Sequence, residues 1–303
     1  MKYFIFCVLF CFGWCGSFQT IHADPIVELS YTYTTINVPG STFTSAYGIN
    51  NSGQIVGAYT DSTGAGHGFL DTDGTFTTLP FVPTGINNVG QMVGLSSTGL
   101  ILDTNGVITD IALTALPNFG GFPYGGEKIV KINDLGQIVG NYYDQYFGNR
   151  GFIYSNGIFT LIRAANPFLN EEGISAHGIN NAGQILVTIE YTGGTYTYLY
   201  QDEQYTPIFT LQQDLHFVSG VALNNVGQAL GYIPIATYIY TNGVVGYIHL
   251  PQPNAPYDIN DAGVIVGENV IATPVPEPHS LLLFAGGLAV LGLLRRRRQR
   301  PLA

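Results

Sequence analysis

Six copies of one ten-residue motif constrain the architecture of this chain more than any other feature of its sequence. The motif first reads GINNSGQIVG, and its leading asparagine recurs at positions 50, 87, 133, 180, 224 and 260. The resulting intervals of 37, 46, 47, 44 and 36 residues are typical of propeller blades and of helical repeats. Residues that favour strands dominate every copy, which excludes the helical option.

Each copy predicts a β-hairpin. Asn50 fits the first position of a type I turn, and Gly53 fits the bulge position that follows it, where positive φ is required. Ile49 precedes this turn and Ile55 and Val56 follow it, which indicates strands buried on both faces. The predicted turn glycines are Gly53, Gly90, Gly136, Gly183, Gly227 and Gly263.

A second hairpin follows in most copies, so that each unit supplies four strands. The segment at 68–79 reads GFLDTDGTFTTL and parallels GFIYSNGIFTLI at 151–162. An Asp-Gly or Asn-Gly pair between apolar runs is a strong signal for a two-residue turn. The fourth copy has Asp202, Glu203 and Gln204 instead of a turn glycine, and we expect a wider loop there. Four strands make one propeller blade.

The two ends of the repeat array predict how the ring closes. The sixth copy stops soon after Gly267 without a second hairpin, whereas residues 33–36 match 76–79, the last strand of the first unit. We therefore predict an all-β, six-bladed β-propeller over residues 24–273, closed by its N-terminal strand, because closure removes exposed sheet edges. A linear β-solenoid is the alternative, but its coils tolerate changes of ten residues in repeat length less readily.

The last thirty residues indicate a destination for the chain. An apolar run from Leu281 to Leu294 rises about 21 Å as a helix, which is shorter than the ~30 Å core of a bilayer. Cationic residues that stop such a run are typical of an anchor with a cytoplasmic C-terminus. We predict a single transmembrane helix at 279–294, with an ordinary tail anchor or a buried basic-ended helix as alternatives. The cationic residues are Arg295, Arg296, Arg297, Arg298 and Arg300.

The segment at 274–303 resembles the PEP-CTERM sorting signal, because Pro276, Glu277 and Pro278, the apolar helix and the arginines follow one another in the family's order. This resemblance implies a Gram-negative bacterium and recognition of the Pro-Glu-Pro motif by exosortase, a membrane protease-transferase. It also implies transient anchoring in the inner membrane, then a periplasmic, cell-surface or extracellular location linked to exopolysaccharide. The repeats resemble the HAF repeat of bacterial extracellular proteins, which implies location and architecture more than activity.

The N-terminus predicts export. Lys2 precedes an apolar run, and Ala23 is a small residue at a plausible cleavage point, so residues 1–23 fit a signal peptide. All three cysteines lie inside this segment, and a lipoprotein signal at the last of them is the alternative. They are Cys7, Cys11 and Cys15. The exported chain is therefore expected to contain no disulfide.

Charge is unevenly distributed along the chain. All 20 acidic residues lie from Asp24 to Glu277, and this segment has four cations, which gives 4 − 20 = −16 with histidine neutral. The four cations are Lys128, Lys131, Arg150 and Arg163. Such a surface repels nucleic acid, and it repels anionic polysaccharide unless a cation bridges the two.

Signals for catalysis or cofactors are weak. The four histidines of the exported segment lack the spacing of a zinc site, and we assign no catalytic residue and no metal ligand. They are His67, His177, His216 and His249. Residues 71–74 read DTDG but lack the later Glu of an EF-hand, so only weak calcium binding at the surface is considered.

The carboxylate pairs Glu171-Glu172 and Asp202-Glu203 are adjacent in sequence, so their side chains point apart on an extended chain and form no glycosidase pair. We predict a non-catalytic binding or interaction module; a polysaccharide hydrolase or lyase with a loop-built site is the alternative. The Gly- and Pro-rich insertion at 112–130 is the first candidate for a binding loop. Clustered tyrosines suit sugar or protein contacts, although they are also good strand formers.

Overall fold

The computed structural model describes most of the repeat region. The described residues are 26–97, 99–121, 130–146, 148–163, 171–191, 194–208, 218–233, 236–251 and 255–276. Predictions for the signal peptide at 1–23, the helix at 279–294 and the arginines after it lie outside these residues. Glu277 and Pro278 also lie outside them, whereas Pro276 is the last described residue.

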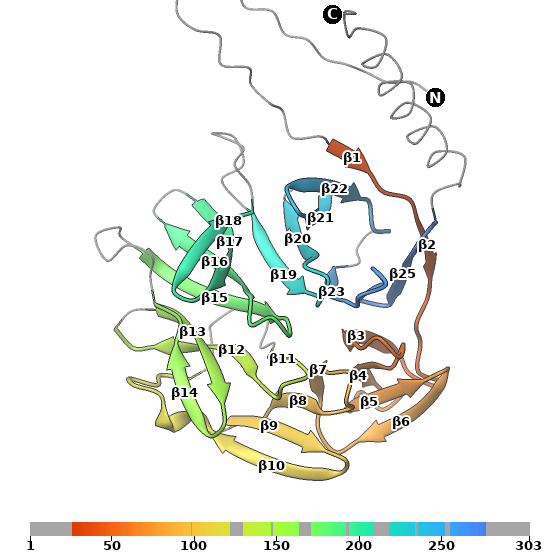
Figure 1. Cartoon of the computed structure of the whole chain (residues 1–303). Helices are drawn as coiled ribbons and strands as arrows, with labels where there is room; N and C mark the ends of the chain where they lie inside the picture. The colour runs from red at the N-terminus through yellow and green to blue at the C-terminus, as the bar shows by residue number, and fades with distance from the viewer. Residues whose placement is uncertain are drawn as a thin grey trace, which may run out of the picture.

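Six antiparallel four-stranded units surround a central axis, which confirms the propeller and excludes the solenoid (Figure 1). Blade 1 contains β3 (Phe43–Ile49), β4 (Ile55–Thr60), β5 (Gly66–Thr72) and β6 (Thr75–Leu79). Blade 2 contains β7 (Pro83–Ile86), β8 (Met92–Leu95), β9 (Gly99–Thr104) and β10 (Val107–Ala112), followed by the 3-10 helix η1 (Leu113–Ala115). Blade 3 contains β11 (Lys131–Ile132), β12 (Ile138–Asp144), β13 (Gly148–Ser155) and β14 (Ile158–Leu161).

The remaining blades complete the circle. Blade 4 contains β15 (Glu171–Ile179), β16 (Ile185–Tyr191), β17 (Gly194–Gln201) and β18 (Gln204–Pro207). Blade 5 contains β19 (Ser219–Leu223), β20 (Ala229–Ile233), β21 (Ala236–Thr241) and β22 (Val244–Ile248). Blade 6 contains β23 (Pro256–Ile259), β24 (Ile265–Gly267) and β25 (Val270–Pro274), with β2 (Tyr31–Thr34) as its fourth strand.

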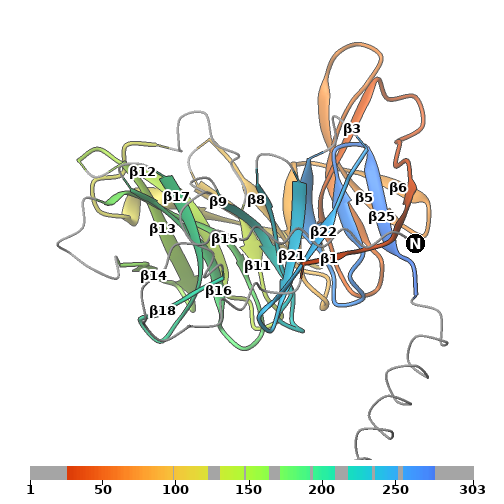
Figure 2. The same ribbon diagram turned by 90° about the horizontal axis from the view of Figure 1, so that it is seen from above.

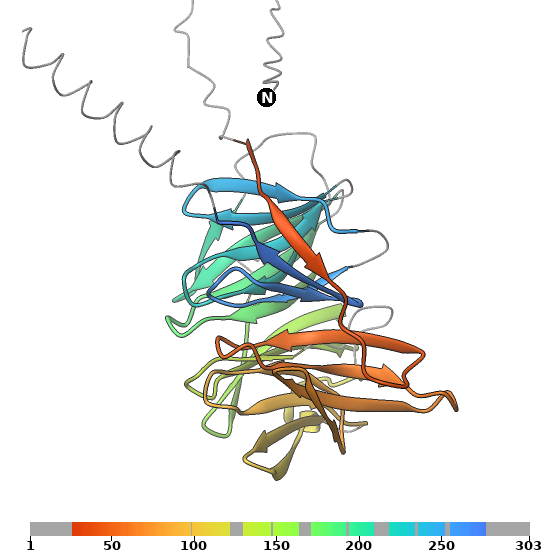
Figure 3. The same cartoon turned by 90° about the vertical axis from the view of Figure 1, so that its right-hand side faces the viewer.

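The N-terminal segment closes the ring, as the sequence predicts. β2 pairs antiparallel with β25 from Tyr31↔Pro274 to Thr34↔Ile271, two residues earlier than the expected strand at 33–36. A short strand that we did not predict, β1 (Ile26–Glu28), pairs in parallel with β22 on blade 5 (Figure 2). Figure 3 shows this red-orange segment running past the blue sixth blade toward the orange first blade. One segment therefore binds two neighbouring blades.

The turns follow local sequence rules with one exception. All six turn glycines of the repeats have positive φ, between 74° and 82°, and the Gly53 N–H bonds the Asn50 carbonyl at 3.1 Å. The wider loop expected in the fourth copy is wrong. Gln201 pairs directly with Gln204 across a two-residue turn, and Asp202 and Glu203 take φ of 50° and 60° without a glycine.

The apolar core lies between neighbouring blades. Val93 and Leu100 of blade 2 pack with Ile138 and Phe152 of blade 3, for example, and all four are buried. Burying each such side chain contributes about 1.5–3 kcal/mol. Gly57 allows two adjacent strands of its own blade to approach closely. A Cβ there would lie 2.0 Å from the Ser45 carbonyl oxygen on the adjacent strand.

The ring has two distinct ends. The turns between the first and second strands of each blade, and those between the third and fourth strands, lie together at one end, called here the turn face. The loops between the second and third strands and the connections between blades lie at the opposite end, called the loop face. Strand directions dictate this division, since antiparallel neighbours return to alternate ends.

Candidate functional site

An inner ring of asparagines ties the blades together at the turn face. Asn50 Oδ1 accepts the backbone N–H groups of Ser52 and Gln54 at 3.1 and 3.0 Å, which fixes its own turn. Its Nδ2 donates to the Asn87 carbonyl of the next blade at 3.2 Å. The same inter-blade bond recurs from Asn87 to Asn133, Asn133 to Asn180, Asn224 to Asn260 and Asn260 to Asn50, at 2.9–3.3 Å.

The residue that follows each inner-ring asparagine in the sequence, an Asn or an Asp, belongs to an outer ring. The Asn51 N–H donates to Asn88 Oδ1 at 2.7 Å, and five equivalent bonds of 2.7–2.9 Å complete the circle. Asp134 also accepts Nδ2 bonds from Asn88 at 2.9 Å and from Asn181 at 2.6 Å. Burial raises the pKa of Asp134, but these hydrogen bonds outweigh burial and hold that pKa below its ordinary value.

A buried ion pair crosses the channel inside these rings. Lys131 Nζ of blade 3 lies 3.0 Å from Asp258 Oδ2 of blade 6, and it donates to the Tyr47 and Tyr257 carbonyls at 2.7 and 3.1 Å. Asp258 also accepts the Ile49 N–H at 3.2 Å. The remaining cavity of about 60 Å³ has room for a few waters and is too small for a sugar.

Sequence reasoning missed this pair, although the repeats contain a signal for it. Lys131 and Asp258 stand where three other copies have a glycine, as at Gly48, and their charges are opposite. They belong to copies 3 and 6, which are diametrically placed in a ring of six. Two departures from the repeat at opposite positions are therefore a sign of contact across the channel.

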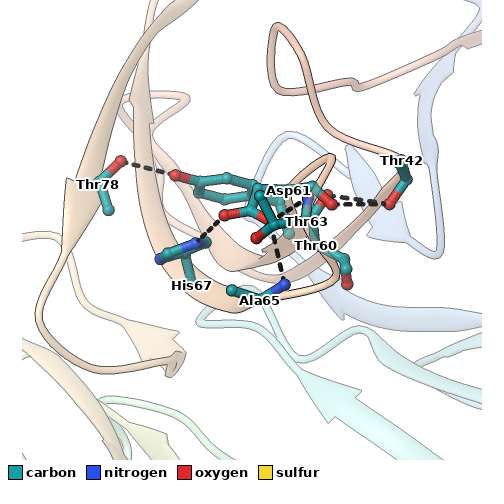
Figure 4. Close-up of polar contacts among 8 residues, drawn as sticks. Thr42, Thr60, Asp61, Thr63, Ala65, His67 and Thr78 are labelled. Atoms are coloured by element: carbon teal, nitrogen blue, oxygen red, sulfur yellow. Dashed lines mark hydrogen bonds and ion pairs between the residues drawn. The ribbon is translucent and has the colours of Figure 1, made fainter.

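At the loop face of blade 1, Asp61 organises the β4–β5 loop (Figure 4). Its Oδ1 accepts the Thr63 N–H, the Thr63 hydroxyl and the Ala65 N–H at 2.8, 2.6 and 3.0 Å, and its Oδ2 lies 2.8 Å from His67 Nε2. The bonds from Thr63, His67 and Ala65 hold the Asp61 pKa well below its usual range.

This cluster does not form a nucleophile site. In a Ser-His type of site the hydroxyl bonds an imidazole base, whereas the Thr63 hydroxyl and His67 Nε2 bond different oxygens of Asp61 and not each other. His67 stacks on Tyr59 with ring centroids 5.0 Å apart, and the Tyr59 hydroxyl lies 2.9 Å from Thr78 Oγ1. The contacts of this group therefore hold the loop and its aromatic ring in place.

The other predicted candidates are dispersed. His177 Nε2 is buried with no hydrogen-bond partner among the described residues, and burial lowers the His177 pKa to about 4. His249 is exposed, while His216 and the side chains of Glu171 and Glu172 lie outside the described part of the chain. Within the described part, no group of three or more His, Cys, Asp or Glu residues forms a metal site.

The described half of the 112–130 insertion packs onto blade 3. Leu113 and Leu116 are buried, and Phe119 forms a β-bridge with Asp144. Beside this segment, at the loop face between blades 3 and 4, lies a cavity of about 470 Å³. It is lined by Pro117, Asn118, Asp144, Arg150, Leu161, Ile162, Arg163 and Ile174. Its volume falls in the usual range of ligand sites.

Comparison with protein families identifies the C-terminal segment. Residues 274–298 match the PEP-CTERM protein-sorting motif. The motif implies an extracellular protein that is sorted by exosortase and anchored in the membrane transiently before cleavage, and the described residues form a β-propeller. Among the described residues, no helix is long and apolar enough to cross a membrane. No curated protein matches the chain.

Solved structures resemble this chain in fold. YCF48 bound to D1 peptide is 12% identical, with a TM-score of 0.48, over 84% of this chain and 100% of that one. A gluconolactonase of Xanthomonas campestris is 10% identical, also with 0.48, over 84% and 99%. An Aleuria aurantia lectin in complex with Fucα1-6GlcNAc is 13% identical, with 0.47, over 78% and 99%. Such low identities say nothing about activity.

Proposed function

We propose that this protein is a non-catalytic binding module of the cell surface or extracellular matrix, linked to exopolysaccharide or biofilm. The observation that carries the proposal is the position of the sorting motif next to the closure of the ring. β25 ends at Pro274, the Val275 N–H bonds the Ser30 carbonyl at 2.9 Å, and Pro276 follows. Cleavage beyond Pro276 therefore leaves every strand of the propeller in place.

Two features of the propeller support a binding function and not a catalytic one. The turn face is occupied by hydrogen-bonded rings, and the channel is closed by Lys131 and Asp258. Both features favour a rigid scaffold that presents its loop face to a partner. The HAF-type resemblance of the repeats supports an extracellular setting.

The first test concerns sorting. The full chain is produced in a host with exosortase, with an affinity tag inserted between Asn105 and Gly106, because exposed turns tolerate insertions. Intact-mass analysis is expected to show loss of the arginine tail. Glu277→Ala is expected to retain the tail, whereas Asp110→Ala, which removes an exposed carboxylate elsewhere, is not. A tail that is retained in all three proteins would refute exosortase sorting.

The second test concerns ligand binding. Sorted protein is passed over immobilised matrix polysaccharides, and the eluted sugars are analysed for cleavage. Retention without new reducing ends or unsaturated products is the expected result. Release of shortened products would refute the non-catalytic assignment and favour a hydrolase or lyase.

A further inference from the structure

The cavity between blades 3 and 4 has a composition that is unusual for this chain. The segment from Asp24 to Glu277 contains four cationic residues. Lys131 is committed to the channel, and Lys128 lies outside the described residues. Arg150 and Arg163, the other two, both line this one cavity. With Asp144 the lining residues carry +1, within a segment whose formal charge is −16.

The acidic residue of the cavity is already engaged. Asp144 Oδ1 accepts the Tyr146 N–H at 2.8 Å, and its Oδ2 accepts a long bond from Asn118 Nδ2 at 3.4 Å. Asp144 is 3% exposed, so its charge acts from the wall of the cavity and not from its mouth. Arg163 is exposed at the end of β14. The most accessible charge in the cavity is therefore positive.

A buried hydroxyl lies next to these charges. The Tyr142 side chain is fully buried, and Tyr142 pairs directly with Arg150 across β12 and β13. Burial raises the Tyr142 pKa, the charge of Asp144 and a hydrogen bond between the two side chains raise it further, and the charge of Arg150 lowers it.

The walls of the cavity are apolar and are backed by aromatic rings. Ile162 and Ile174 are buried at its base. The Tyr205 hydroxyl donates to the Arg163 carbonyl, and the Tyr200 and Tyr205 rings lie 4.9 Å apart. These contacts fix the backbone from which the Arg163 guanidinium extends. An apolar wall with a few fixed polar groups is the usual design of a small-ligand site.

We propose that this cavity binds a carboxylate-bearing sugar unit of an acidic polysaccharide. The planar guanidinium group of the exposed Arg163 suits a carboxylate, because it donates paired, charge-assisted hydrogen bonds, and Arg150 adds positive charge to the same cavity. The apolar walls suit the C–H face of a sugar ring. This inference rests on the proposed binding function and names its ligand class. The surrounding negative charge favours a short or chain-terminal unit over a long polyanion.

The test uses the sorted protein, because the unprocessed arginine tail binds polyanions by itself. Titration calorimetry compares a tetrasaccharide of glucuronic acid with the glucose tetrasaccharide that results from reduction of its carboxyl groups. Binding of the acidic sugar is expected, with at least a tenfold loss on carboxyl reduction. Arg163→Gln is expected to weaken binding at least tenfold as well. Thr77→Asp on the outer strand of blade 1 makes the same change in net charge and is expected to leave affinity unchanged.

Arg163→Lys separates geometry from charge, and it is expected to lose most of the affinity because an ammonium lacks the paired donors. Equal binding of the two tetrasaccharides would overturn the inference, as would unchanged affinity in Arg163→Gln. Either result leaves the binding module intact if other matrix polysaccharides are retained. Failure to retain any polysaccharide would instead refute the proposed function. Unchanged urea midpoints of the variants exclude misfolding as the cause of a loss.

Discussion

Asn87→Ala tests whether the inner ring holds the blades together. Asn87 is 3% exposed, and its Nδ2 donates to the Asn133 carbonyl at 2.9 Å and to Gln91 Oε1 at 2.8 Å. Its Oδ1 accepts the Gln91 N–H at 2.8 Å. Alanine removes three hydrogen bonds of about 1 kcal/mol each, and it leaves the Gln91 N–H without this acceptor, at a further cost of about 1–2 kcal/mol. We therefore expect a loss of about 4–5 kcal/mol in the free energy of unfolding.

Urea denaturation followed by circular dichroism measures this loss. Val89→Ala, in the same turn, is the matched control, because Val89 is 62% exposed and its truncation is expected to cost under about 0.5 kcal/mol. A loss below about 1 kcal/mol for Asn87→Ala would refute the role of the ring. A lower slope against urea would show that the junction between blades 2 and 3 opens before the rest unfolds.

Three further perturbations address the channel, the pH dependence and the closure. Lys131→Met leaves Asp258 unpaired in the channel, so denaturation is expected to show a loss of about 3–5 kcal/mol that Asp258→Leu partly restores in the double variant. His177 has a folded pKa of about 4, below the ~6.5 of an unfolded histidine, so stability is expected to fall by up to about 3 kcal/mol from pH 6.5 to 4. His177→Gln should remove that component, and an unchanged pH profile would contradict it. Deleting residues 26–34 removes β1 and β2, so a lower melting temperature is expected, and an unchanged one would refute closure by this segment.

The strands and turns of the blades could be predicted from the sequence because the residues that determine them are close together in the chain. The positive φ of Gly53 follows from the turn that Asn50 begins, and a two-residue outer turn follows from Asp73-Gly74, with φ of 51° and 81°. Closure was predictable because residues near the N-terminus repeat the pattern of a fourth strand, which the sixth copy lacks. Each of these inferences compares a segment with its own neighbours or with another copy.

The inter-blade contacts could not be derived in the same way. Asn50 is a good turn residue by itself, and nothing in its own copy shows that its Nδ2 donates to the Asn87 carbonyl, 37 residues away. The prediction of a wider loop at Asp202 and Glu203 was wrong because local preference was given too much weight there. Pairing of β17 with β18 imposes positive φ on residues that do not favour it. Tertiary contacts, and not local preference, decide both.

The repeats and the departures from them therefore answer different questions. Residues shared by the copies, such as Asn87 and Asn88, form the blade junctions at the turn face. The candidate cavity is formed by residues that do not repeat, including Asn118 from the insertion and Arg163 after β14. A ring whose junctions are fixed at one end tolerates variation in length and charge at the other end without loss of the fold. For this reason, the search for a ligand begins at the loop face between blades 3 and 4.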